Sequence, residues 1–268
     1  MNAIRSTRIS RLAAVAVAAA LVLGGPGRVG AQPHPVRIAA ASDLRFALEE
    51  VVARLRLVQP AFDVQVTYGS SGTFFAQLVN GAPFDLFMSA DTDYPKQLAM
   101  RGLMLAGSEF TYAIGRLVVW VPAASPLDVE KNGLQVLLDR RVTHVSIANP
   151  ATAPYGRAAE AAMRQAKVYD RVKPKLVLGE NVAQALQFVQ SASADVGIVA
   201  LSLAIAPRVQ NTGRFWTIPL DMYPRLEQGG VILRSAASPD RARAVRAFLI
   251  GEEGRSILRR YGFFLPGT

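Results

Sequence analysis

The chain has 268 residues, of which 51% are hydrophobic and 19% charged, and this composition excludes a disordered protein while allowing one large domain or two lobes. It contains no cysteine and only two histidines, so we expect no disulfide, no lipid anchor, no cofactor and no metal held directly by side chains. The formal net charge is +10.

The N-terminal segment has the pattern of an export signal. Arg5, Arg8 and Arg11 precede the unbroken apolar run Leu12–Leu23, and small residues follow at Val29–Ala31. A run of about 12 residues is too short to span about 30 Å of hydrocarbon as a helix. We therefore predict a signal peptide over residues 1–31 and a mature periplasmic chain with 26 basic and 20 acidic residues.

Strand and helix patterns alternate through the first part of the mature chain. Short apolar or alternating runs predict strands, and apolar residues at helical spacing predict the helices that follow them. The strands are expected at Val36–Ala41, Asp63–Tyr68 and Phe84–Met88, and the helices at Ala47–Val58, Phe74–Leu78 and Tyr94–Arg101. Three such repeats predict an α/β lobe with a largely parallel sheet flanked by helices.

A second series of the same kind begins near Leu117. Its strands are expected at Leu117–Val121, Val145–Ala148, Lys175–Leu178 and Val196–Val199, and its helices at Arg157–Ala166 and Val182–Val189; the tail adds a strand at Gly230–Leu233 and helices at Pro239–Leu249 and Glu253–Tyr261. Hinge candidates lie at 109–115 and 219–229. The sequence thus predicts two lobes joined by two strands, with lobe 1 formed by 32–114 and 225–268 and lobe 2 by 115–224.

Polar and glycine-rich residues stand where predicted strands lead into helices. Ser42 and Asp43 follow the first strand, and the run Gly69–Thr73 contains Ser70 and Ser71 at the next junction. The second series has similar junctions at Asn149–Gly156, which includes Tyr155, and at Asn181–Val182. Helix N-termini beyond the carboxyl ends of strands attract anions, although serine, aspartate and proline here are equally typical of helix capping and turns.

Seven short motifs in order resemble the periplasmic molybdate-binding proteins of ABC importers, which have the two-lobed type II solute-binding fold. The resemblance covers Val36 to Phe264. Its motifs are Ala40–Ser42, Gly69–Thr73, Gly81–Asp91, Asn149–Pro150 with Ala153–Gly156, Asn181–Val182, Gly197–Val199 and Arg260–Phe263.

The resemblance implies a site in which uncharged donors hold a tetrahedral oxyanion, molybdate or tungstate. Ser42 and Ser71 would donate hydroxyl and backbone N–H groups, Tyr155 and Val182 backbone N–H groups, and Ser70 would be a neighbour. Ala200 stands where many members have a tyrosine, and the phenol of Tyr155 is expected to replace that donor. The resemblance also implies hinge closure on the anion, delivery to a membrane permease, a monomer and no catalysis.

Asp43 is unusual beside a dianion, and we interpret it as a helix-capping carboxylate that faces away from the site. Because a site made only of donors leaves the O–H of a protonated phosphate unpaired, we expect phosphate to be rejected.

Three other functions remain open. A receptor of the same fold could bind another oxyanion or a small organic acid, for which Arg45 or Arg157 would supply a guanidinium. An exported serine hydrolase would need a nucleophile elbow, which Gly69–Gly72 does not match, and a histidine better placed than His34 or His144. Nucleic-acid binding is disfavoured because the basic residues are spread along the chain without interleaved aromatics.

Overall fold

The computed structural model describes residues 34–267. The predicted signal peptide, residues 1–31, lies outside the described residues. Within the described part of the chain, no helix combines the length and apolar character that a membrane span requires.

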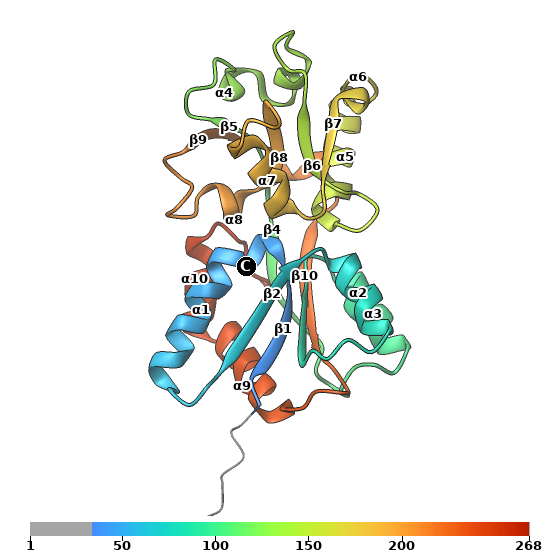
Figure 1. Cartoon of the computed structure of the whole chain (residues 1–268), viewed down its shortest axis with the longest axis vertical. Helices are drawn as coiled ribbons and strands as arrows, with labels where there is room; N and C mark the ends of the chain where they lie inside the picture. The colour runs from blue at the N-terminus through green and yellow to red at the C-terminus, as the bar shows by residue number, and fades with distance from the viewer. Residues whose placement is uncertain (1–33, 268) are drawn as a thin grey trace, which may run out of the picture. The chain divides into compact units, whose positions relative to one another are not determined.

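Two five-stranded sheets form the framework (Figure 1). The first has the order β2 (Val64–Gly69), β1 (Val36–Ala41), β3 (Leu86–Ser89), β10 (Leu226–Ile232) and β4 (Phe110–Gly115). The second has the order β7 (Leu176–Gly179), β6 (Val145–Ala148), β8 (Val196–Ala200), β5 (Leu117–Pro122) and β9 (Gly213–Thr217). Each strand predicted from the sequence is present within a few residues, and β4 lies in the predicted hinge segment 109–115, whereas β9 was not predicted.

The expectation of largely parallel sheets is only half right. Strand β1 pairs in parallel with β2 and β3, but β10 is antiparallel to both β3 and β4. The second sheet repeats this arrangement, because β6 is parallel to β7 and β8 while β5 is antiparallel to β8 and β9. In the first sheet the parallel strands β1 and β2 are joined by one crossover helix, α1, whereas β10 enters the sheet from η4 after the chain has passed through the second sheet, and it runs in the opposite direction.

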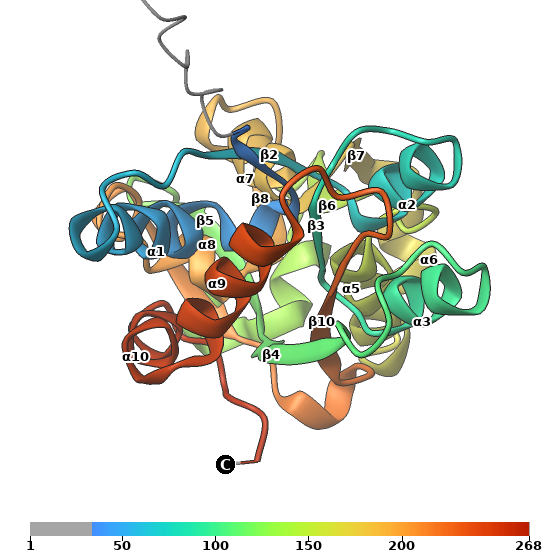
Figure 2. The same ribbon diagram turned by 90° about the horizontal axis from the view of Figure 1, so that it is seen from below.

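Helices cover both faces of the first sheet (Figures 1 and 2). On one side lie α1 (Arg45–Val58), α9 (Pro239–Ile250) and α10 (Glu252–Arg260), and on the other α2 (Ser71–Val79) and α3 (Asp93–Met100). Strand β1 alternates between these faces: Ile38 and Ala40 pack toward one core cluster and Ala39 toward the other. All three side chains are fully buried, which explains why the strand is apolar from Ile38 onward, after the exposed Arg37.

The second sheet is packed by α7 (Val182–Gln190), which contacts β6, β7 and β8, and by α5 (Pro154–Gln165), which contacts β6 and β8. Shorter helices complete the fold: α4 (Val129–Asn132), α6 (Tyr169–Val172), α8 (Leu201–Ala204) and the 3-10 helices η1 (Ser42–Leu44), η2 (Gly133–Leu138), η3 (Lys173–Lys175) and η4 (Leu220–Met222). The chain passes from β4 to β5 through Arg116 and returns through η4 to β10.

Candidate functional site

Four helix N-termini are brought together by strand register. In the first sheet, Ala41 at the end of β1 pairs with Gly69 at the end of β2, so the junctions into η1 and α2 are neighbours. In the second sheet, Ala148 pairs with Gly179, which places the segments leading to α5 and α7 side by side in the same way. Each sheet therefore presents two junctions at the carboxyl ends of adjacent parallel strands, where open α/β sheets bind ligands.

The four junctions enclose one small hollow. Its empty volume is about 190 Å³, and its lining comprises Ala41, Ser42, Asp43, Gly69, Ser70, Ser71, Ala90, Ala153, Pro154, Tyr155, Asn181 and Val182. All five residues selected from the sequence, Ser42, Ser70, Ser71, Tyr155 and Val182, are among them, and each is at most 3% exposed. This space, which includes open solvent, is smaller than the roughly 300–1,000 Å³ of sites for drug-sized ligands, so the hollow excludes a ligand of that size.

Two serine hydroxyls have their protons free for a ligand. The Ser71 Oγ atom accepts a hydrogen bond of 2.9 Å from the Ala90 N–H, and the Ser42 Oγ atom accepts one of 3.2 Å from the Ala183 N–H. Among the described residues, neither hydroxyl donates to an acceptor. Because each oxygen is already an acceptor, its O–H group is left to donate into the hollow.

Backbone N–H groups add further donors. Val182 is the first residue of α7, and the Asn181 side chain before it caps the N–H groups of Ala183 and Gln184 rather than that of Val182. Ser71 is the first residue of α2, and Tyr155 is the second residue of α5. The first N–H groups of a helix have no acceptor within the helix. The arrangement therefore presents N–H groups and the positive ends of helix dipoles to one point.

Direct hydrogen bonds join the two sides of the hollow. The Ser70 hydroxyl donates to the Thr152 carbonyl at 2.6 Å, and the Gly72 N–H donates to the same carbonyl at 2.8 Å. A Cβ atom at Gly72 would lie 2.7 Å from that oxygen, so only glycine permits this approach. The Ser70 hydroxyl proton is thus engaged in a hydrogen bond to Thr152 across the hollow. The sequence did not indicate that Thr152 accepts this bond.

The phenol of Tyr155 does not take the role expected of it. Its O–H donates to Asp43 Oδ2 at 3.1 Å, and its oxygen accepts a bond of 3.2 Å from Gln228 Nε2. Burial, followed by the charge of Asp43, raises the pKa of the Tyr155 phenol well above its ordinary value. The phenol therefore bonds to Asp43 and Gln228 and not to a ligand in the hollow. Ala200 is fully buried at the end of β8 and does not line the hollow.

Asp43 also differs from the expectation. Its side chain makes no capping bond to η1 and does not face away; it lines the hollow, 1% exposed, with Oδ2 accepting from Tyr155 and, at 2.6 Å, from Gln228 Nε2. Burial raises its pKa from 3.8 to about 6, against the lowering effect of these bonds and of the nearby Asp43 and Leu44 N–H groups. The interpretation failed because sequence shows a capping residue type but not the partners that arrive from β10 and α5.

Within the described part of the chain, the residues that line the hollow include no arginine, lysine or histidine. Arg45 pairs with Glu49 on the surface of α1, and Arg157 bonds to Asp91 Oδ2 at 2.7 Å with its guanidinium 5.6 Å from the centre of the Tyr94 ring. Neither arginine lines the hollow, so the guanidinium expected for an organic carboxylate is absent from its lining. Over residues 34–267, no cluster of three or more histidine or acidic side chains could hold a metal ion.

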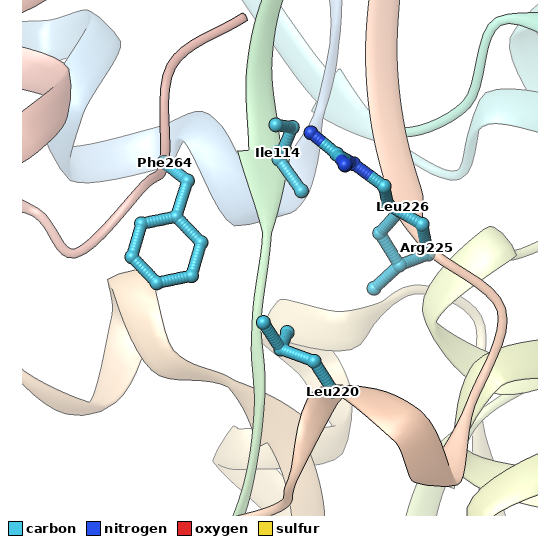
Figure 3. Close-up of a pocket in the computed structure, with 5 residues that line it drawn as sticks. All are labelled: Ile114, Leu220, Arg225, Leu226 and Phe264. Atoms are coloured by element: carbon cyan, nitrogen blue, oxygen red, sulfur yellow. The ribbon is translucent and has the colours of Figure 1, made fainter. Parts of the chain in front are cut away.

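A larger hollow, of about 960 Å³ including open solvent, lies beside the strands that link the two sheets (Figure 3). Ile114 of β4, Leu226 of β10, Leu220 and Phe264 supply apolar walls, and Arg225 adds the only charged group among its lining residues. Arg225 is paired with Glu227 at 3.2 Å. None of the four junctions contributes to this larger hollow.

The sequence and the structure were compared with known proteins. The pattern of the bacterial extracellular solute-binding protein family matches residues 36–264. The molybdate-binding protein ModA of Rhodobacter capsulatus is 36% identical over 94% of this chain and 96% of its own length. A solved periplasmic molybdate-binding protein from Azotobacter vinelandii superposes with a TM-score of 0.81 at 32% identity, covering 86% of this chain and 99% of that one. The sulfate-binding protein SubI of Mycobacterium tuberculosis, with a TM-score of 0.71 over 87% of this chain and 88% of its own, shares the fold at 16% identity.

Proposed function

Because this chain belongs to the bacterial extracellular solute-binding proteins and has their two-lobed type II fold, we propose that it is a periplasmic receptor that binds molybdate or tungstate between its lobes and delivers the anion to an ABC transporter permease. The relatives from Rhodobacter capsulatus and Azotobacter vinelandii are molybdate-binding proteins, and the lining of the hollow offers a donor set for such an anion. The observation that carries the proposal is that Ser42, Ser71, Tyr155 and Val182, from four separate junctions, line one buried hollow.

The binding chemistry follows from the donors. Hydrogen bonds to a charged oxyanion contribute about 1.5–3 kcal/mol each, so several of them suffice without a buried arginine. We propose that Ser42 and Ser71 donate through hydroxyl and backbone N–H groups, that Tyr155 and Val182 donate through N–H groups, and that Ser70 supports closure through its bond to Thr152. Release then requires only that the lobes separate.

The lobe boundaries belong to the same proposal. We assign 32–114 and 225–268 to lobe 1 and 115–224 to lobe 2, supported by the passage of the chain from β4 to β5 and its return from η4 to β10. We further propose that residues 1–31 direct export, that the mature chain is a monomer without a lipid anchor, and that it acts as a receptor rather than an enzyme.

Calorimetric titration of the mature protein tests this function. Molybdate and tungstate are expected to bind at micromolar concentration or below, and sulfate and phosphate much more weakly. Absence of heat with both metal oxyanions, from a protein that melts cooperatively, would reject the proposal. Preferential binding of sulfate would instead assign the same fold to another oxyanion.

A further inference from the structure

Asp43 lines the hollow and carries a carboxylate, which does not fit a site built only of donors. Asp43 Oδ1 is buried and makes no hydrogen bond of ordinary geometry, while Oδ2 holds both Tyr155 and Gln228. A buried polar atom without a partner costs free energy, and a carboxylate beside a dianion adds repulsion. The residue nevertheless lines the hollow next to Ser42, which donates to the anion in the proposed function.

We propose that the receptor binds its oxyanion together with one proton, which Asp43 holds at Oδ1 and shares with an oxygen of the anion. The inference rests on the proposed function and adds a proton-coupled, specificity-determining residue to that site. A carboxylate oxygen and an oxyanion oxygen can both be satisfied at hydrogen-bonding distance only when a proton lies between them. The proton comes from the solvent, so the complex contains one more proton than the free carboxylate form of the protein.

Among residues 34–267, the hydrogen-bond partners of Asp43 carry no positive charge. Tyr155 from α5 and Gln228 from β10 bond to its side chain, and Ser202 from α8 donates to its backbone carbonyl at 2.8 Å. Neither α7 nor α8 contains a charged residue. On β4, the Tyr112 phenol donates to the Ser89 carbonyl, and its pKa is raised by burial first and then by the charges of Asp43 and Asp91.

Three other charged groups, Asp91, Arg45 and Arg116, have partners other than Asp43, and the Arg116 guanidinium lies 4.8 Å from the centre of the Phe264 ring. Asp91 bonds to Arg157, and on α1, which follows η1, Arg45 pairs with Glu49 at the surface. No arginine or lysine among residues 34–267 bonds to the Asp43 carboxyl. Because burial has already brought its pKa to about 6, the arrival of a dianion would raise that pKa further and fix the proton near neutral pH.

This proton changes how the site selects ligands. Since Asp43 Oδ1 can also accept the O–H group of a singly protonated phosphate, the lack of an acceptor no longer rejects that anion. Selection against phosphate must then rest on the size of the hollow and on the positions of its donors. The expectation of a site made only of donors is corrected at this residue.

Proton uptake can be measured directly on the intact mature protein. Molybdate is titrated calorimetrically at about pH 8 in two buffers that differ in ionisation enthalpy. The difference in observed heat is expected to report about one proton taken up per anion. The affinity should fall up to about tenfold for each pH unit above about 6, because each binding event then requires one proton.

The substitution Asp43→Asn provides the matched test, because its amide carries a permanent donor in place of the proton. The variant is expected to take up no proton when it binds molybdate. Its own affinity for molybdate should therefore stay constant between about pH 6 and about pH 8.5. Asp85→Asn is the control, since Asp85 is an equally buried carboxylate of the same lobe that accepts from the Arg37 and Ser238 N–H groups and does not line the hollow. This control should keep the proton uptake of the unmodified protein.

Each result has one meaning. Binding by the unmodified protein without proton uptake, at an affinity independent of pH, overturns the inference and leaves the receptor function intact. The inference is supported if Asp43→Asn loses the proton uptake while the unmodified protein and Asp85→Asn keep it. If the unmodified protein binds neither molybdate nor tungstate, the receptor function itself fails. Should Asp43→Asn fail to fold, the two-buffer measurement on the unmodified protein still decides the question.

Discussion

The two halves of the proposed anion site use different parts of the polypeptide. In our proposal the lobe 1 half supplies side-chain groups, the hydroxyls of Ser42 and Ser71 and the carboxyl of Asp43, in addition to the two serine N–H groups. The lobe 2 half supplies the N–H groups of Tyr155 and Val182, whose side chains do not donate into the hollow. The comparison indicates that single substitutions can tune selectivity in lobe 1, whereas lobe 2 contributes donors that depend on backbone geometry.

Removal of both hydroxyls should break the lobe 1 half most severely. For Ser42→Ala with Ser71→Ala we expect molybdate affinity to fall by about 100-fold or more, because two charge-assisted bonds of about 1.5–3 kcal/mol each are lost. Calorimetric titration measures the loss. An affinity within about threefold of the unmodified protein would mean that these hydroxyls do not touch the anion.

The two single variants should differ in stability without ligand. Ser71→Ala leaves the buried Ala90 N–H without its acceptor, at a cost of about 1–3 kcal/mol. Ser42→Ala is expected to cost less, because the Ala183 N–H retains the Asn181 side chain as an acceptor. Denaturant unfolding of both variants gives the comparison, and a larger loss for Ser42→Ala would contradict it.

The Asp43 carboxyl should lower the free energy of unfolding at pH values above its pKa. Because the folded-state pKa of Asp43 is raised from 3.8 to about 6, folding binds a proton between these values, and stability falls as pH rises through them. At about pH 8, Asp43→Asn should therefore gain up to about 3 kcal/mol relative to the unmodified protein, and the gain should vanish near about pH 3.5. Unfolding of the ligand-free proteins at several pH values tests this, and a pH-independent difference would refute it.

The lobe 2 half can be tested by removing one N–H group. Val182 is the first residue of α7, a position that tolerates proline, so Val182→Pro deletes the donor while keeping the helix. We expect about a tenfold or greater loss of molybdate affinity from the missing charge-assisted bond. Val182→Ala, which keeps the N–H group, is the matched control and should bind within about threefold of the unmodified protein. Equal behaviour of the two variants would place Val182 outside the donor set.

Local sequence patterns were sufficient for most of the framework. Apolar runs and helical spacing predicted β1, α1, β6 and α7 within a few residues, because these elements are buried in ways that periodicity reflects. The antiparallel pairing of β10 with β3 was not predictable in this way. It depends on where the chain re-enters the first sheet after 110 intervening positions of lobe 2, the segment assigned to 115–224.

The sequence by itself determined the alternation of strands and helices, the small polar residues at four junctions and, through resemblance, the residues that line one hollow. Only the tertiary structure decided the roles of their side-chain atoms: the Tyr155 phenol serves Asp43, and the Ser70 proton serves Thr152. Periodicity is a local property of a chain. A hydrogen-bond partner, in contrast, depends on which atoms from distant segments arrive at the same point, and burial then determines whether a carboxyl such as that of Asp43 keeps its proton.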